Sequence, residues 1–276
     1  MPDSKRRNSS GSAYSTLEWL SNHYSIKSEG RFEFIAGLPI LPGDKVLDLG
    51  CANGAWARII AERVGINGSV CGIDRDPELV HHATKTHRNN HLSQRLSFDV
   101  LDIETDVFPL GFNIIVAFNT ISLTQKPLSV FRKIHSYIKE NRGLFIIKDS
   151  ALSSDFYWPI DKRIREEISV ALSSGARING YDPDFALTCR KYLRDSGFKI
   201  SETRLKSYAF MYPFGKEQKV YISQNAKMIQ ELKPAHIKLD MLDSWINTEM
   251  AKDGNFFSDP DSIYTTTEFA YICHAT

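Results

Sequence analysis

The residues best suited to chemistry form a turn of small residues at the end of an apolar run. The run Lys45–Leu49 leads into Gly50, Ala52 and Gly54, and a segment with helical periodicity follows. Farther along the chain, a second apolar run ends in Asp74. Gly50 allows a sharp turn, Ala52 allows a ligand to approach the backbone, and Gly54 begins a helix whose first N–H groups are unpaired. This pattern is typical of a βαβ unit that binds a nucleotide-like ligand.

Acidic residues follow the second and third apolar runs. Asp74 can accept hydrogen bonds from both hydroxyl groups of a ribose. Asp102 can accept one from an adenine amino group, while the neighbouring Ile103 covers one face of the ring. Asp99 is the alternative to Asp102 in this register, and Asp102 is preferred because Phe98 still belongs to the apolar run.

The fourth and fifth apolar runs also end in polar residues, Asn119 and then Lys148-Asp149. The carboxyl ends of adjacent parallel strands meet at a crevice, and open α/β sheets bind their ligands there. Asp149 is therefore the candidate for a general base, with a helix-capping or strand-end role as its alternative.

The elements that must position these residues alternate along the chain. Short β-branched or aliphatic runs separated by helical patterns predict a parallel sheet that is covered on both faces. Right-handed crossovers make it a doubly wound, Rossmann-like sheet. The expected strands are 45–49, 69–73, 96–101, 113–118 and 143–148, and the helices between them are 55–64, about 77–89 and about 127–138.

The rest of the chain surrounds this core. We expect a flexible tail over 1–13, an N-terminal helical cap over 14–41 and one α/β domain over 42–276, with lid insertions at about 151–180 and 215–258. Within the domain, the patterns predict helices at 155–174 and 182–196, the second capped by Asp182, and one or two more within 217–252. Strands at 199–212 and 264–275 complete a mostly parallel, seven-stranded sheet with a helical lid insertion before its last strand.

Composition narrows the class of protein. The chain has 276 residues, is 42% hydrophobic and 24% charged, and has a formal net charge of +1. This charge provides no overall field that would attract nucleic acid or an anionic membrane. The four cysteines have no C-x-x-C spacing, which indicates core residues in a reducing compartment. No apolar run reaches the roughly 18 residues of a membrane helix, so we expect a cytoplasmic protein.

These motifs resemble those of the class I S-adenosylmethionine-dependent methyltransferases, and within them the small-molecule, ubiquinone-biosynthesis-like (type 11) group. The first family motif is an acid, a hydrophobic residue and G-x-G-x-G, which Asp48-Leu-Gly-Cys-Ala-Asn-Gly54 matches with Ala52 in place of the middle glycine. The ribose acid of the family falls on Asp74, the adenine-contacting acid on Asp102 and the fourth motif on Phe118-Asn119. The resemblance covers about residues 28–150 well and extends more loosely to 181–201 and the closing strand.

The resemblance implies that the cofactor is S-adenosylmethionine and that the product is S-adenosylhomocysteine. It implies in-line methyl transfer to a small, apolar or aromatic molecule of natural-product or secondary metabolism. Residues 215–258 and the N-terminal helices carry no family signature and are expected to set the choice of acceptor. The cofactor-binding residues it implies are Asp48, Gly50, Cys51, Ala52, Gly54, Trp56, Asp74, Arg75, Asp102, Ile103 and Asn119.

Three alternatives stay open at this point. A nicotinamide-dependent dehydrogenase needs G-x-G-x-x-G, which Trp56 breaks at its last position. An RNA or protein methyltransferase could use Lys5-Arg6-Arg7 as a basic arm, but the tetrad after the fourth strand, Asn119-Thr-Ile-Ser, departs from N-P-P-Y. A non-catalytic protein that binds S-adenosylmethionine is the third. We expect no membrane partner and no nucleic acid, and leave a homodimer open.

Histidines near the second helix resemble a metal cluster at first sight. His81, His82, His87 and His91 occur close together, with His87 and His91 four residues apart. No carboxylate or cysteine completes a zinc set, so we interpret these histidines as a solvated helix face and expect no metal. Glu166-Glu167 and His135 are interpreted in the same way, as surface or packing residues.

Overall fold

The computed structural model describes residues 16–173, 182–233, 236–251 and 254–276. The chain divides into two compact units. The first comprises Met1–Asp149, Ala186–Arg204 and Phe269–Thr276, and the second comprises Ser150–Phe185 and Leu205–Glu268. The expected tail over 1–13 and the last part of the expected lid over 151–180 lie outside the described residues.

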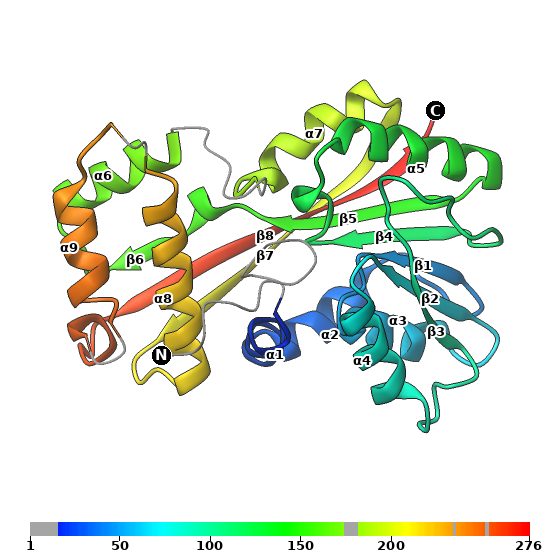
Figure 1. The fold of residues 1–276 in the computed structure, drawn as a ribbon, viewed down its shortest axis with the longest axis horizontal. Coiled ribbons are helices and arrows are strands. Elements are labelled where there is room, and N and C mark those ends of the chain that lie inside the picture. The colour runs from blue at the N-terminus through cyan, green and yellow to red at the C-terminus, as the bar shows by residue number, and fades with distance from the viewer. Residues whose placement is uncertain (1–15, 174–181, 234–235, 252–253) are drawn as a thin grey trace. The chain divides into compact units, whose positions relative to one another are not determined.

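A parallel sheet forms the centre of the first unit (Figure 1). Its strands are β1 (Lys45–Leu49), β2 (Ser69–Asp74), β3 (Leu96–Val100), β4 (Ile114–Phe118) and β5 (Leu144–Ser150). β1 pairs in parallel with both β2 and β4, β3 pairs with β2, and β5 pairs with β4. Because both faces of a parallel sheet are covered, strands such as β4 are apolar and buried along their whole length.

Helices cover both faces of this sheet. Ile60 of α3 belongs to a buried cluster with Val46 of β1, and residues of α2 join the same cluster. On the other face, the Phe131 ring of α5 lies 6.1 Å from the ring of Phe145 and stacks on Tyr192 of α7 at 5.9 Å. Figure 1 shows α5 and α7 on one side of β4 and β5, and α2, α3 and α4 on the other. The described helices of the first unit are α1 (Leu17–Ile26), α2 (Ser28–Gly37), α3 (Ala55–Val64), α4 (Pro77–His87), α5 (Pro127–Asn141) and α7 (Phe185–Asp195).

The complete sheet confirms the expected fold class. Its strand order is β3-β2-β1-β4-β5-β8-β6, and β7 pairs with β8. The added strands are β6 (Phe156–Trp158), β7 (Phe198–Met211) and β8 (Ile263–Ala275), and β6 is antiparallel to β8. The protein is thus a Rossmann-like α/β protein with a mixed sheet, N-terminal helices and a helical insertion before the last strand. Within the part of the chain that the structure describes, the sheet has eight strands, one more than expected.

The additional strand, β6, occupies the start of the helix expected over 155–174. Tyr157 is buried and its neighbours on either side are exposed, which is the alternation of a strand. Pro159 has no N–H and cannot lie inside a helix, so α6 begins only at Lys162 and runs to Ser173. Pro159 is the signal that the sequence interpretation overlooked.

The helix expected over 182–196 also begins later, at Phe185. Asp182 Oδ1 accepts a hydrogen bond from the Asp184 N–H at 3.0 Å, just ahead of the helix. The boundaries of the five core strands differ from expectation by at most two residues.

The second unit packs α6, α8 (Lys216–Glu231) and α9 (Asp240–Thr248) with β6 and the adjoining parts of β7 and β8. Tyr157 lies 5.1 Å from Trp245 and 5.0 Å from Tyr264, ring centre to ring centre. Glu167 of α6, expected on a charged surface, accepts a hydrogen bond from the Leu242 N–H in the first turn of α9 at 2.7 Å. None of the helices in the described ranges has the length and apolar content needed to cross a lipid bilayer.

A buried polar cluster lies inside the second unit. The Tyr264 hydroxyl, which is completely buried, donates to Asp155 Oδ2 at 2.6 Å. The Asn225 side-chain amide donates to the same hydroxyl oxygen at 2.7 Å and to Asp155 Oδ2 at 3.2 Å. The cluster therefore ties β8, α8 and the segment before β6 together through one hydroxyl group.

The Tyr264→Phe variant tests this link. Removing the hydroxyl takes one hydrogen-bond acceptor from the buried Asn225 amide and one donor from the Asp155 carboxylate. We therefore expect the free energy of unfolding to fall by about 1–3 kcal/mol. The measurement is urea unfolding, with Tyr212→Phe as the control because Tyr212 is 46% exposed. Equal stability of the two variants would contradict the structural role of the cluster.

Candidate cofactor site

The turn between β1 and α3 is built from residues in left-handed conformations. The φ angles of Gly50, Ala52 and Gly54 are 68°, 49° and 77°. The N–H groups of Gly50 and Cys51 both donate to the Ile73 carbonyl, at 2.7 and 3.0 Å, so the turn is anchored on β2. A left-handed alanine costs energy, and such conformations are concentrated at binding sites because the surrounding contacts enforce them.

Glycine is required at both ends of this turn by the neighbouring strands. A Cβ on Gly50 would lie 2.2 Å from Thr120 Cγ2, and the Thr120 hydroxyl donates to the Gly50 carbonyl at 3.3 Å. A Cβ on Gly54 would lie 2.6 Å from the ring of Phe98 on β3. The absence of a Cβ at Gly50 and Gly54 therefore leaves room for Thr120 and Phe98. It also allows the expected backbone turn.

Asp74 at the end of β2 holds the same turn in place. Its Oδ2 accepts from the Ala52 N–H and its Oδ1 from the Asp76 N–H, each at 2.9 Å. Burial raises the pKa of the Asp74 carboxyl, while these two hydrogen bonds oppose the rise. Each carboxylate oxygen can accept a further hydrogen bond, so the two hydroxyl groups of a ribose fit this residue.

Asp48 is the buried acid of β1. Burial, and secondarily the charge of Asp74, raises the pKa of the Asp48 carboxyl to about 8. Asp48 Oδ2 has no hydrogen-bond partner among the described residues. A buried polar atom without a partner is costly unless a ligand or water supplies one, which suits a residue in a binding site. Cys51 beside it is also buried, which raises the pKa of its thiol well above the ordinary value and keeps it protonated.

The ends of β4 and β5 are joined through Asn119. Asn119 has a φ of 56°, and its N–H donates to the Lys148 carbonyl at 2.8 Å. The Lys148 ammonium donates to Asn119 Oδ1, and the Asn119 amide nitrogen lies 3.5 Å from Asp149 Oδ1. Lys148 and Asp149 are both buried. The structure thus brings the base candidate Asp149 beside Asn119, at the end of β5.

The residues expected at the adenine end follow β3. Asp102 lies two residues beyond the strand, half-buried, and its Oδ1 accepts from the Glu104 N–H at 2.8 Å. Ile103 is buried. The rival residue Asp99 lies inside β3 and its Oδ2 accepts a weak hydrogen bond from the Cys71 thiol at 3.5 Å. Arg75 is half-buried and directly follows Asp74.

The residues of the N-terminal helices that contact Trp56 were not among the site residues predicted from the sequence, although these helices were expected to set the choice of acceptor. The Trp56 ring, in the first turn of α3, makes edge contacts with Phe34 of α2 at 5.9 Å and Phe118 of β4 at 4.9 Å. The Arg31 guanidinium of α2 lies 4.7 Å from the centre of the same indole and equally close to the Tyr24 ring. Arg31 precedes Ile35 by four positions and so lies on the buried face of its helix, which is the signal that could have revealed it.

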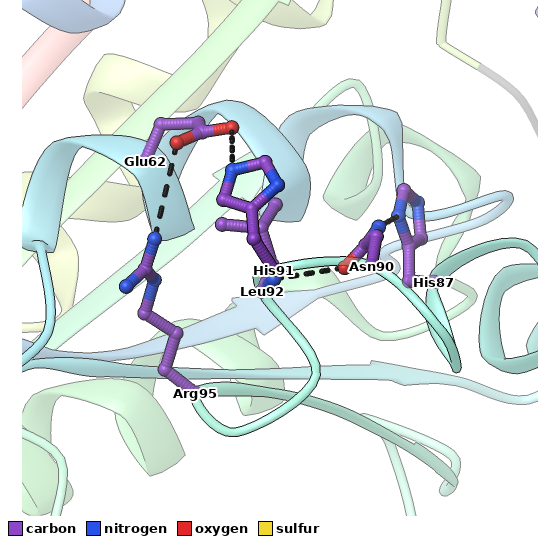
Figure 2. A network of polar contacts seen from close by, with 6 residues as sticks. All are labelled: Glu62, His87, Asn90, His91, Leu92 and Arg95. Carbon is purple, nitrogen blue, oxygen red and sulfur yellow. Dashed lines mark hydrogen bonds and ion pairs between the residues drawn. The ribbon is translucent and has the colours of Figure 1, made fainter.

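Of the four histidines expected on a solvated face, His81 and His82 are exposed, and His87 and His91 belong to two separate hydrogen-bond networks (Figure 2). The exposed His91 ring points toward Glu62, with 2.8 Å between Nε2 and Oε1. His87 is buried instead of solvated, and its Nδ1 lies 3.0 Å from the Asn90 amide nitrogen. Across the described ranges, the His, Cys, Asp and Glu side chains form no group of three or more that could hold a metal ion.

The Gly50→Ala variant tests the packing of the turn. Its Cβ would collide with Thr120, in addition to the strain of a side chain at a positive φ, so we expect a loss of about 2–5 kcal/mol in the free energy of unfolding. Gly43→Ala is a matched control, because Gly43 has a φ of 93° and open space around it. Urea unfolding measures the free energy of unfolding of both variants. An equal loss of stability in Gly50→Ala and Gly43→Ala would contradict a collision with Thr120.

The raised pKa of Asp48 makes a prediction about pH. Between the ordinary value of 3.8 and about 8, the folded chain keeps a proton that the unfolded chain has lost. The free energy of unfolding therefore falls as pH rises through this window, by at most about 1.4 kcal/mol per pH unit. Asp48→Asn removes the titration, so its stability relative to the unmodified chain should rise from pH 6 to pH 8 in thermal unfolding. A difference that stays constant over this range would contradict a buried, protonated Asp48.

Comparison with known proteins agrees with the resemblance to methyltransferases seen in the sequence. A family model described as "Methyltransferase domain" matches residues 40–180. The chain is 28% identical over 133 residues to a putative methyltransferase, 235L, of Invertebrate iridescent virus 6, which covers 47% of this chain and 48% of that protein. It is 28% identical over 179 residues to phosphoethanolamine N-methyltransferase 1 of Arabidopsis thaliana, which covers 64% of this chain and 33% of that protein. The chain thus spans a half or less of these relatives' length.

Solved structures agree in fold. Phosphoethanolamine N-methyltransferase 2 of Haemonchus contortus, in complex with phosphomonomethylethanolamine and S-adenosylhomocysteine, superimposes with a TM-score of 0.53 at 15% identity, over 96% of this chain and 58% of that one. The family match extends over just over half of the chain and includes the turn, Asp74 and Asn119. The chain therefore belongs to the class I S-adenosylmethionine-dependent methyltransferase family.

Proposed function

We propose that this chain transfers the methyl group of S-adenosylmethionine to a small, apolar or aromatic molecule. One observation carries the proposal. β1 lies between β2 and β4, so the strand order reverses at β1, and the left-handed turn that follows β1 contacts the ends of both neighbours. The point where the order reverses is where open α/β sheets bind nucleotide-like ligands.

The residues present fit this cofactor. We assign the ribose to Asp74 and the adenine to Asp102, Ile103 and the adjacent Arg75. The Gly50–Gly54 turn, including Cys51 and Ala52, provides backbone groups along the ligand. Trp56, Asn119 and the buried carboxyl of Asp48 then lie toward the amino-acid end.

The cofactor brings an activated methyl group on a sulfonium and departs as a thioether. The leaving group is already good, so the contribution of the protein is to hold the acceptor atom in line with the methyl group. A base is needed only where the acceptor atom must lose a proton. Asp149, buried beside the Asn119 amide, is the proposed base for such an acceptor.

The acceptor class rests on the relatives. Those matched include phosphoethanolamine N-methyltransferases, a juvenile hormone acid O-methyltransferase of Bombyx mori and an aklanonic acid methyltransferase of Streptomyces, all named for small molecules. The aromatic residues of the second unit give weaker support for an apolar or aromatic acceptor, because the rings of Trp245 and Tyr264 pack against Tyr157. We propose that α8 and α9, within the insertion over 215–258, act as a lid that selects the acceptor.

Calorimetry with S-adenosylmethionine and with NAD tests the cofactor assignment. We expect the unmodified chain to bind S-adenosylmethionine and not NAD. Asp74→Ala removes an acceptor of two hydroxyl donors and should weaken binding by at least about 100-fold, given about 1.5–3 kcal/mol for each hydrogen bond to a charged group.

Asp195→Ala is the control for this experiment, since Asp195 lies at the exposed end of α7. Thermal unfolding of both variants separates lost binding from lost folding. The assignment is overturned if the unmodified chain fails to bind S-adenosylmethionine, or if a folded Asp74→Ala variant binds it as well as the unmodified chain does.

A further inference from the structure

The connection between β3 and β4 carries two residues assigned to the adenine, Asp102 and Ile103. Residues 101–113, all of which the structure describes, form it without a helix or a strand. β3 is at the end of the strand order and β4 follows β2 and β1, so the connection has to pass two other strands. Binding residues on such a segment depend on a rigid scaffold for their position. Contacts that hold this connection therefore also set the position of Asp102.

Lys133 of α5 is the first of two side chains that fasten the connection. Its ammonium donates to the Ile103 carbonyl at 3.1 Å and to the Asp106 carbonyl. Lys133 Nζ also lies 4.1 Å from the centre of the Phe108 ring, which is buried. An ammonium has three donors and no acceptor, so this half-buried lysine can hold two carbonyls of one loop at a fixed place on α5.

The Lys133 contact reaches the Asp102 side chain through a single peptide group. The carbonyl of this group is that of Ile103, to which Lys133 donates. Its N–H is that of Glu104, which donates to Asp102 Oδ1 at 2.8 Å. The Asp102 main chain is fixed as well, because its N–H donates to Asp106 Oδ2 at 2.9 Å. Hydrogen bonds in a chain polarise one another, so the ammonium strengthens the bond that orients the carboxylate.

Glu104 fastens the same connection at the start of α5. Its carboxylate accepts from the Gln125 N–H, at 3.1 and 3.2 Å, and from the Lys126 N–H, at 2.8 Å. Lys126 is the N-cap residue of α5, and within the described residues its side chain makes no capping hydrogen bond. Glu104 thus brings a negative charge to the N-terminus of α5, where the helix dipole favours it. The contact joins the loop after β3 to the loop after β4.

Tyr137 of α5 anchors the farther part of the connection. Its hydroxyl accepts from the Phe112 N–H at 3.1 Å and donates to the Pro109 carbonyl at 2.9 Å. Both partners follow Asp106 in the chain. The connection therefore has a separate anchor for its packing on α5, whereas Lys133 and Glu104 act on the part that contains Asp102.

We propose that Lys133 and Glu104 are positioning residues of the cofactor site, which hold Asp102 where it can accept a hydrogen bond from the 6-amino group of adenine. This inference rests on the function proposed above and on the assignment of the adenine to Asp102. Neither positioning residue is assigned a contact with the cofactor. A carboxylate that is oriented before the ligand arrives lowers the cost of binding, and it rejects a base that presents an acceptor in place of the amino group.

The test compares two ligands that differ at the 6-position of the base. The probes are S-adenosylhomocysteine and S-inosylhomocysteine, in which an oxygen replaces the 6-amino group. Calorimetry on the unmodified chain should show S-adenosylhomocysteine binding at least about 10-fold more tightly, because the inosine ligand loses a hydrogen bond to a charged group.

The variants Lys133→Met and Glu104→Gln assign this selectivity to the positioning residues. Each should weaken S-adenosylhomocysteine binding by about 3- to 10-fold and change S-inosylhomocysteine binding by less than about twofold, so that the ratio of the two affinities narrows. Lys133→Arg keeps a donor on α5 and should restore part of the ratio. Glu104→Gln keeps the shape of its side chain and carries the test if Lys133→Met fails to fold.

Two controls separate positioning from support of the fold. Lys139→Met removes another lysine of α5, which donates to the Thr276 carbonyl at 2.8 Å and not to the connection, and should leave both affinities unchanged. Tyr137→Phe removes the separate anchor. It should lower the free energy of unfolding, measured in urea, without changing the ratio of the affinities.

A double-mutant cycle shows whether Lys133 acts through Asp102. In the Asp102→Ala background, Lys133→Met should change S-adenosylhomocysteine binding by less than about twofold, because the group that it positions is already gone.

Three results would overturn the inference while leaving the proposed function intact. They are an unchanged ratio of the two affinities in both variants, an equal loss of affinity for both ligands, and additive losses in the double variant. An unmodified chain that binds the two ligands equally well would remove the assignment of the adenine to Asp102, and the inference with it. An unmodified chain that binds neither ligand would overturn the proposed function itself.

Discussion

The hydrogen bond from the Ala52 N–H to the Asp74 carboxylate is the interaction on which the candidate site depends. It joins the turn after β1 to the end of β2 and stabilises a left-handed alanine that would otherwise be unfavourable. The second oxygen of Asp74 accepts from the Asp76 N–H, and Asp76 in turn caps α4. One carboxylate thus determines both the shape of the turn and the point at which the next helix begins.

The third neighbour, β4, is joined to this arrangement by packing. Thr120 fills the space that a side chain on Gly50 would occupy, and Asn119 adopts a left-handed conformation next to it. Strained residues therefore lie at the ends of two adjacent strands, where their energetic cost is compensated by contacts to both sides. The buried carboxyl of Asp48 adds a further cost, which a bound ligand can offset. The site is organised for binding at the expense of the stability of the empty fold.

Much of the architecture could be predicted because it follows from local patterns. Apolar runs separated by helical periodicity indicated the five parallel strands, and their ends brought Asp74, Asp102 and Asn119 to one edge. The error at β6 has a local cause as well, since the aromatic residues before Pro159 match a helix and a strand equally in composition. What decides between a helix and a strand here is pairing with β8, a segment more than a hundred residues away in the chain.

By itself, the sequence determined the turn, the acids that follow the strands and the family to which they point, because these depend on residue type and on spacing along the chain. Only the tertiary structure decided that Asp74 holds the turn, that Gly50 admits Thr120, and that Arg31 and Lys148 meet at Trp56. The physical reason is that these contacts join elements that are not consecutive along the chain, the end of β1 with the ends of β2 and β4, and α3 with α2 and β5. Their geometry depends on how the buried faces pack. Burial then determines which charges carry a cost, as it does for Asp48, and no local pattern contains that information.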